Sequence, residues 1–466
     1  MLFNSFIFLE LVIITFVLYY IPLLSKFQIP ILIISSLLFY SYSQPELVIL
    51  LLVSVTINIV SSYYVVYGTN KKSYAVFGVV CNLGILIFFK YGPLIAATFF
   101  GQTNTVGNFF VNMPLPIGIS FFTFQGISLV VDVYSQKFND NKFLVPRSFI
   151  QHAQRILFFK SFFPQLVSGP IVKAHDFIPQ IETKFLSEIA WESCFKSIVA
   201  GYFLKLVIAD NLNDFTFRIA HPFFLGQSSF VLIMLLYGYS CQIFADFAGY
   251  SLIAIGISKL FGYNLMDNFN FPYISTSFKE FWKRWHISLS SFLMEYLYVP
   301  LGGNKKGKIR TYVNLMIVML LGGLWHGAAW SYALWGIFHG LALAIERLFN
   351  DNFKIKLSTP VLILKGALVF GYVSLAWLLF KLPDLNHVAE YFKCIYKNSK
   401  LETNIRIVIY IVTYSYPIII YHLLYLFKRK YEHINLKKLE FLFYAVMIFL
   451  IFTNSSSSES FIYFQF

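Results

Sequence analysis

Long apolar runs follow one another along almost the whole chain, and they constrain the fold more than any other feature. A bilayer core of about 30 Å needs about 20 apolar residues in a helix. Because backbone polar groups in lipid must be satisfied internally, such runs predict helices. We expect an all-α polytopic membrane protein with about 11–13 transmembrane helices, some of them broken or re-entrant. The runs lie near residues 5–24, 29–42, 46–67, 74–100, 111–134, 153–170, 193–213, 229–262, 311–349 (two helices), 361–382, 404–427 and 439–453.

The composition agrees with this fold class. Of the 466 residues, 58% are hydrophobic and 12% are charged, whereas soluble proteins average about half and a quarter. The net charge is +14, but the 36 lysines and arginines fall mostly in short gaps between apolar runs. That pattern is typical of cytoplasmic loops under the positive-inside rule, and it argues against a nucleic-acid partner. The gaps are too short for a separate soluble domain, so residues 1–466 are expected to form one integral membrane domain.

The sequence offers no motif for a metal or a bound cofactor. Cys81, Cys194, Cys241 and Cys394 are scattered and lack CxxC spacing, which disfavours a metal or disulfide framework. HxxxH, HExxH and the two common glycine-rich nucleotide motifs are missing as well. We therefore expect no bound metal or cofactor.

Three histidines lie in the segment 281–340, where the chain becomes dense in tryptophan, glycine and positive charge, and two of them, His286 and His326, are candidate site residues. His326 lies well inside an apolar run, where an ionisable group is costly and often marks a pathway or reaction site. Desolvation there would leave a neutral imidazole that accepts a proton. The alternative is a core histidine bonded to a neighbouring helix, which the sequence GGLWHGAAW makes less attractive. His286 lies beside the apolar stripe of an expected interfacial helix, Phe278 to Leu293, and either faces inward or stays at the interface.

Two further sets of charges leave alternatives open. Asp246 is the one acid in the apolar run from Phe230 to Ile257, and it needs a partner. It either braces two helices or orients a catalytic group. Four basic residues either hold the phosphates of a cytosolic donor or are positive-inside anchors: Lys305, Lys306, Lys308 and Arg310.

The chain resembles bacterial membrane-bound O-acyltransferases of the alginate and peptidoglycan O-acetyltransferase branch. The similarity is strongest over residues 116–343. The matching stretches are GISFFTFQGISLVVDVY from Gly118, FFPQLVSGPI from Phe162, DFAGYSLIAIG from Asp246, FNFPYISTSFKEFWKRWHISLSSFL from Phe269, YLYVPLGGN from Tyr296 and LGGLWHGAAWSYALWGIFHG from Leu321.

The resemblance implies a helical bundle around a central tunnel in the bacterial inner membrane. It makes His326 the catalytic histidine and His286 a second, tunnel-lining position. It also implies acetyl-CoA as the donor substrate, an exported polysaccharide as the acceptor and a periplasmic esterase-like partner. Between the two polymers we favour peptidoglycan over alginate, because the richness in Phe, Ile, Lys and Asn suggests a low-GC genome.

Acyl transfer needs a base for the hydroxyl proton and donors for the oxyanion. We expect His326 to be the base, and Trp325, Trp330 and the backbone N–H groups near Gly322 and Gly323 to shape the site. Three other functions stay open: D-alanyl transfer to teichoic acid, a proton-coupled transporter or flippase that uses Asp246 and the histidines, and a scaffold.

Overall fold

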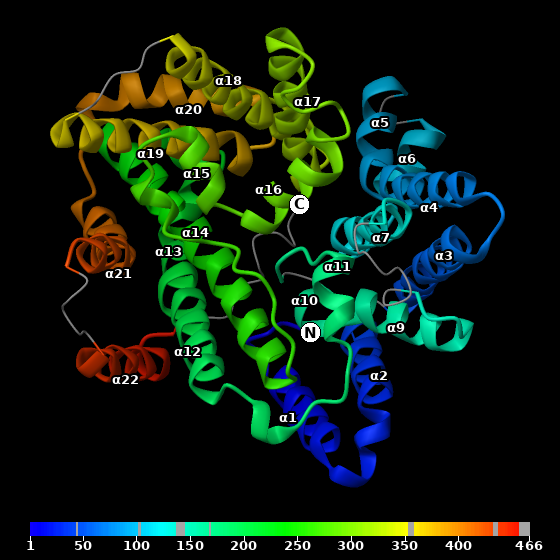
Figure 1. The fold of residues 1–466 in the computed structure, drawn as a ribbon. Coiled ribbons are helices and arrows are strands. Elements are labelled where there is room, and N and C mark those ends of the chain that lie inside the picture. The colour runs from blue at the N-terminus through cyan, green and yellow to red at the C-terminus, as the bar shows by residue number, and fades with distance from the viewer. Residues whose placement is uncertain are drawn as a thin grey trace. The chain divides into compact units, whose positions relative to one another are not determined.

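The described part of the chain is helical throughout. The computed structural model describes residues 1–42, 45–100, 104–136, 145–166, 169–352, 358–431 and 437–455. No strand occurs in these ranges, which confirms the predicted all-α class (Figure 1). Within them, six helical stretches are long and apolar enough to cross a membrane, and three apolar helices are shorter. The expected total of about 11–13 spans includes broken helices and stays a prediction. The six candidates are Pro22–Ser41, Pro45–Tyr67, Lys71–Phe99, Ser229–Leu260, Thr359–Lys381 and Ile405–Lys430.

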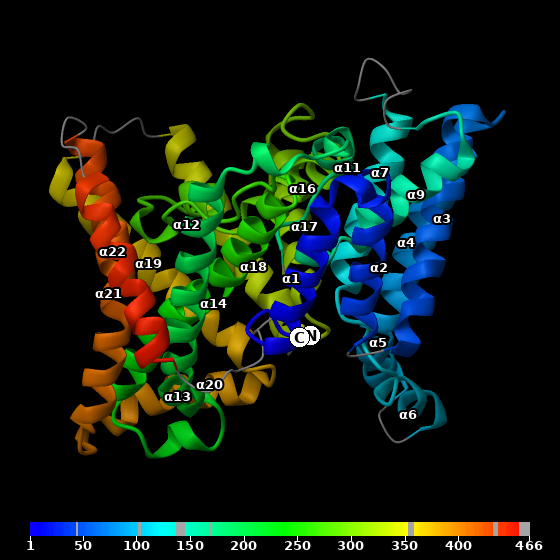
Figure 2. The same cartoon turned by 90° about the horizontal axis from the view of Figure 1, so that it is seen from below.

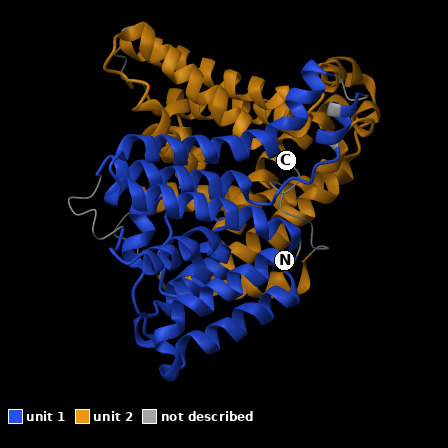
Figure 3. Cartoon of the chain, turned by 90° about the vertical axis from the view of Figure 1, so that its right-hand side faces the viewer, with its two compact units in different colours: residues 1–198, 253–266 blue, residues 199–252, 267–466 orange. Residues whose placement is uncertain are grey.

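The chain divides into two compact units (Figure 3), and we describe each by itself. Unit 1 comprises Met1–Ile198 and Ile253–Met266, and unit 2 comprises Val199–Leu252 and Asp267–Phe466. The expectation of one domain over 1–466 stays a prediction. The helices of unit 1 are α1 (Phe6–Tyr20), α2 (Gln28–Ser41), α3 (Val48–Tyr67), α4 (Lys71–Leu86), α5 (Gly92–Phe99), α6 (Thr105–Val111), α7 (Ile119–Tyr134), α9 (Phe149–Ser161), α10 (Phe163–Leu166), α11 (Ala174–Phe177) and most of α12 (Trp191–Tyr202).

Unit 2 begins in the last turn of α12 and contains most of α14. Its helices are a π-helical segment (Phe203–Ala209), α13 (Asp210–Thr216), α14 (Ser229–Leu260, whose end belongs to unit 1), α15 (Phe278–Arg284), α16 (Ile287–Leu293), α17 (Lys308–His326), α18 (Trp330–Asn352), α19 (Thr359–Lys381), α20 (Leu385–Lys397), α21 (Ile405–Lys430) and α22 (Lys437–Thr453).

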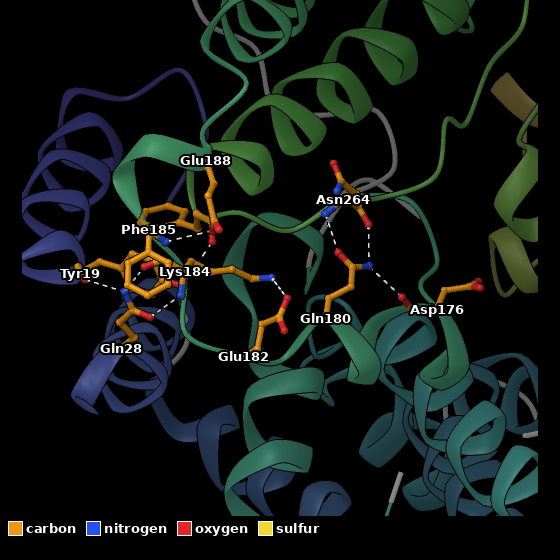
Figure 4. A network of polar contacts seen from close by, with 10 residues as sticks. Tyr19, Gln28, Asp176, Gln180, Glu182, Lys184, Phe185, Glu188 and Asn264 are labelled. Atoms are coloured by element: carbon orange, nitrogen blue, oxygen red, sulfur yellow. Dashed lines mark hydrogen bonds and ion pairs between the residues drawn. The ribbon is translucent and has the colours of Figure 1, made fainter. Parts of the chain in front are cut away.

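In unit 1, α3, α4 and α7 pack against one another and α9 packs on α3 (Figure 2). A connecting loop of the same unit is held by side-chain amides (Figure 4). The Gln28 amide of α2 donates to the carbonyls of Tyr19 and Lys184 and accepts from the Lys184 N–H. Gln180 makes a reciprocal pair with the backbone of Asn264. Side-chain amides thus pair with backbone groups of this loop at both of its ends.

In unit 2, α17 and α18 approach each other at a glycine contact. A Cβ on Gly323 would lie 2.9 Å from the Gly336 backbone, and a Cβ on Gly336 would meet the carbonyl of Met319. Small residues allow helix backbones to pack closely where lipid removes the hydrophobic driving force. This contact fixes the end of α17.

One prediction about this unit is wrong. The expected continuous helix from Phe278 to Leu293 is two helices, α15 and α16, each too short to cross a bilayer. His286 sits at the break with φ +43°, a left-handed conformation. The backbone on either side of this break pairs with residues 268 and 270. Ile287 N–H donates to the Asn268 carbonyl, and Asn270 N–H donates to the Arg284 carbonyl. The apolar stripe nevertheless faces protein, since Phe281, Trp285, Leu289 and Phe292 are buried.

Candidate active site

His326 is the last residue of α17 and is 4% exposed. The next residue, Gly327, has extended backbone and ends the helix, and a Cβ there would collide with the Tyr332 ring. After two more residues α18 begins at Trp330. The run 311–349 therefore forms two helices, as the sequence predicted, and His326 lies at the turn between them.

A cavity of about 650 Å³ within unit 2 reaches His326. Its buried end is formed by His326, Gly322 and Trp335, while Lys279 and Lys283 of α15 line it and are exposed. The imidazole is thus buried but reachable from the surface of this unit. The walls between are mainly apolar and include Ile287, Leu289, Leu293, Met294, Leu315, Val318 and Met319.

Aromatic rings hold the His326 imidazole in place. The ring centroids of Trp325, Trp335 and Phe380 lie 5.1, 5.2 and 5.2 Å from it, in edge-on arrangements. Trp335 also lines the cavity, is 1% exposed, and its Nε1–H has no hydrogen-bond acceptor among the described residues. An indole nitrogen can only donate. The site therefore places a buried imidazole and a buried indole N–H at the same end of the cavity.

His286 lies next to His326, with ring centroids 6.2 Å apart. Its ring is fully buried and packs on Phe247 of α14 at 4.6 Å. Burial lowers the pKa of His286 to about 3, so the imidazole is neutral at physiological pH. Of the two orientations left open for His286, the structure shows the inward one. His286 is not among the residues that line the cavity, whereas its neighbour Ile287 is, so the expected tunnel-lining position stays a prediction.

Asp246 of α14 belongs to a separate ion cluster. The Nζ of Lys205 lies 2.8 Å from Asp246 Oδ1 and 2.7 Å from Asp210 Oδ1, and all three side chains are buried. A buried carboxylate needs such a partner. This geometry fits the interpretation of Asp246 as a brace between helices.

The remaining predicted residues divide between the cavity and other places. Gly322 lines the cavity, but Gly323 packs on α18 and Trp330 is 55% exposed. Gly322 and Gly323 lie inside α17, where their N–H groups belong to the helical hydrogen-bond ladder, so the expected backbone oxyanion donors are not available there. Lys305, Lys306, Lys308 and Arg310 are exposed and are not among the cavity-lining residues.

Sequence reasoning missed several residues of the site. Asn268 contacts His286 from 18 positions earlier in the chain, a spacing with no local signature. Trp335 looked like any other aromatic residue of an apolar helix. Lys279 and Lys283 lie off the apolar stripe of the segment from Phe278 to Leu293, which predicts only that they face water. Among the described residues there is no group of three or more metal-ligating side chains.

Comparison with known proteins adds an independent finding. Residues 109–382 match the model of the membrane-bound O-acyltransferase family. A peptidoglycan O-acetyltransferase of Helicobacter pylori is 34% identical over 393 residues, 78% of this chain and 72% of the relative. A probable alginate O-acetylase AlgI of Pseudomonas aeruginosa is 35% identical over 412 residues, 83% and 73% of the two chains. A teichoic acid D-alanyltransferase of Bacillus subtilis is 28% identical over 289 residues, 58% and 70%.

Proposed function

Because the chain belongs to the membrane-bound O-acyltransferase family and is an enzyme of the membrane, we propose that it moves an acetyl group from cytoplasmic acetyl-CoA to hydroxyls of an exported polysaccharide. We place it in the bacterial inner membrane. The observation that carries the proposal is the cavity that connects exposed lysines with the buried imidazole of His326.

The chemistry follows from the groups at the buried end of the cavity. His326 takes the proton of the attacking hydroxyl, the hydroxyl oxygen bonds to the thioester carbonyl carbon, and the carbon–sulfur bond breaks. The imidazolium then returns the proton to the leaving thiolate. The Trp335 N–H is the proposed donor to the carbonyl oxygen as negative charge develops on it. Apolar walls exclude water, which would otherwise hydrolyse the thioester.

The donor is proposed to enter between α15 and α18. Lys279 and Lys283 lie one helical turn apart on α15, are exposed, and have no ion-pair partner among the described residues. Across the cavity, Glu346 accepts from the Phe278 N–H, and Arg347 pairs with Asp351 at 3.8 Å. The two lysines are therefore the charges available for phosphates, in preference to the four basic residues of the segment 305–310.

Peptidoglycan is our preferred acceptor, with an alginate-type polymer as the alternative. The Helicobacter pylori and Pseudomonas aeruginosa relatives are named for these two chemistries and are nearly equal in identity. The D-alanyltransferase is less similar. We further propose that a periplasmic esterase-like partner completes the transfer to the polymer.

The test is acyl transfer by purified protein in lipid nanodiscs supplied with radiolabelled acetyl-CoA. We expect thioester cleavage or transfer by the wild type and a loss of about 10²- to 10⁴-fold in His326→Ala, the usual contribution of a general base, with unchanged thermal melting. Equal activity of the two proteins would contradict the assignment. Inert wild-type protein that instead carries solute with a proton gradient would favour the transporter.

A further inference from the structure

Asn268 lies buried beneath the break between α15 and α16, in contact with His286. It is 1% exposed, and its Oδ1 lies 3.0 Å from His286 Nδ1. The same oxygen accepts from the backbone N–H of Ser288 at 3.3 Å and from its hydroxyl at 2.9 Å. On the other side, Asn268 Nδ2 donates to Ser251 Oγ at 3.2 Å. The asparagine is therefore held from both ends.

These contacts decide which ring nitrogen of His286 carries the proton. A backbone N–H can only donate, so the Asn268 atom that Ser288 N–H meets must be the oxygen. An amide oxygen can only accept, so His286 Nδ1 must be the donor in the contact with Asn268. A neutral imidazole has one N–H, and its other nitrogen, Nε2, then carries the lone pair.

We propose that Asn268 is a positioning residue of the transfer reaction: it holds the proton of His286 on Nδ1 and presents Nε2 as a hydrogen-bond acceptor beside His326. This role rests on the proposed function. The contacts of the His286 ring are Phe247 from α14, Trp325 and His326 from α17, and the polar pair Asn268 and Ser288. Of these, His326 is the titratable one. The His286 ring is fully buried and is not among the residues that line the cavity, so its fixed tautomer acts on the reaction through the neighbouring His326, which removes the hydroxyl proton.

The first test reads the tautomer directly and needs no enzymatic assay. The full chain is labelled with ¹⁵N-histidine, reconstituted in lipid, and studied by solid-state NMR, and the His286 signals are identified by their absence in His286→Gln. We expect a protonated Nδ1 and an unprotonated Nε2 in the wild type, and loss of that preference in Asn268→Leu. A wild-type His286 protonated on Nε2 would overturn the proposal.

The second test is the pH profile of Asn268→Asp. The carboxylate still accepts from Nδ1, but its charge raises the pKa of His286. Because the acceptor must be neutral, activity is lost as pH falls through the raised pKa, so the acid limb moves to higher pH than in the wild type. Asn268→Leu should lower kcat by about 10- to 100-fold, the usual cost of removing a group that orients a functional histidine.

Ser251→Ala is the matched control, because it removes the partner of Asn268 Nδ2 and leaves every contact of Oδ1. We expect the His286 tautomer and the position of the acid limb to follow the wild type. If Asn268 had only a structural role, the melting temperature would change in Asn268→Leu, Asn268→Asp and Ser251→Ala, and the pH profile of Asn268→Asp would match that of the wild type. That result would refute the proposal. If the wild type transfers no acetyl group, the proposed function fails while the NMR result still decides the tautomer.

Discussion

Each unit buries a group of polar side chains, and the two groups differ in the space around them. In unit 1, Asn58 of α3 and Asn82 of α4 form a reciprocal amide pair, with N···O distances of 3.2 and 3.1 Å. Lys160 of α9 is fully buried and donates to Ser54 at 2.7 Å. In unit 2, the buried His326 borders a cavity of about 650 Å³.

The difference between the clusters is the space around them. In unit 1, α7 presses Gly126 against the amide pair, so that a Cβ there would lie 2.6 Å from Asn58 Nδ2 and Asn82 Oδ1. Interhelical hydrogen bonds of this kind stabilise membrane bundles modestly, by about 0.6 kcal/mol on average. In unit 2 the polar group is reachable by a ligand. Access, more than burial or polarity, distinguishes the proposed reactive site around His326 from the structural cluster of unit 1.

After His326 itself, the comparison predicts the largest effect on activity at Trp335. Trp335→Phe keeps the ring beside His326 but removes the N–H, and we expect kcat to fall by about 10²-fold, as for loss of an oxyanion donor. The measurement is acetyl transfer at saturating donor. Trp377→Phe is the control, because Trp377 stacks on Trp335 with centroids 5.6 Å apart and is not a cavity-lining residue. Equal losses in both variants would mean that aromatic packing, and no donor, explains the effect.

A smaller effect is predicted at the mouth of the cavity. In the double variant Lys279→Gln and Lys283→Gln we expect the KM for acetyl-CoA to rise about three- to tenfold, because exposed charge pairs contribute about 0.2–1 kcal/mol each. kcat should change little. The matched control replaces Lys305 and Lys306 by glutamine. A larger KM increase in that control would show that the phosphates bind at the segment 305–310 and not at Lys279 and Lys283.

The smallest effect on activity is predicted in unit 1. Gly126→Ala should lower stability by about 1–3 kcal/mol through overpacking, measured by thermal melting in detergent, while kcat per folded molecule stays unchanged. Gly84→Ala on α4 is the control, since a Cβ there meets nothing within 4 Å. If Gly126→Ala lowered kcat as strongly as Trp335→Phe, the polar cluster of unit 1 would not be purely structural, and the comparison would be contradicted.

Some of these features could be predicted because they are local. Apolar runs set the helical class through lipid solvation alone, and Gly327 after His326 separated α17 from α18. An ionisable residue inside such a run identified His326 before any contact was known. The position of Asp246 inside an apolar run likewise predicted a charged or hydrogen-bonding partner, but the sequence did not identify that partner as Lys205.

The rest depended on contacts between distant segments. The helical spacing of apolar residues continued through Trp285 and His286, but hydrogen bonds from Asn268 and Asn270 favoured a break there. The basic residues between apolar runs were too numerous to rank without knowing which of them border a cavity. The tautomer of His286 followed only from an oxygen 18 positions earlier in the chain.

The most direct measurement of the central claim is an electron cryomicroscopy structure of the protein with a non-hydrolysable thioether analogue of acetyl-CoA. The account predicts the analogue inside the cavity of unit 2, with the carbon that replaces the acyl carbon within about 3–4 Å of the His326 imidazole or of a hydroxyl oxygen placed against it. An analogue bound elsewhere, with the His326 ring enclosed by side chains, would contradict it.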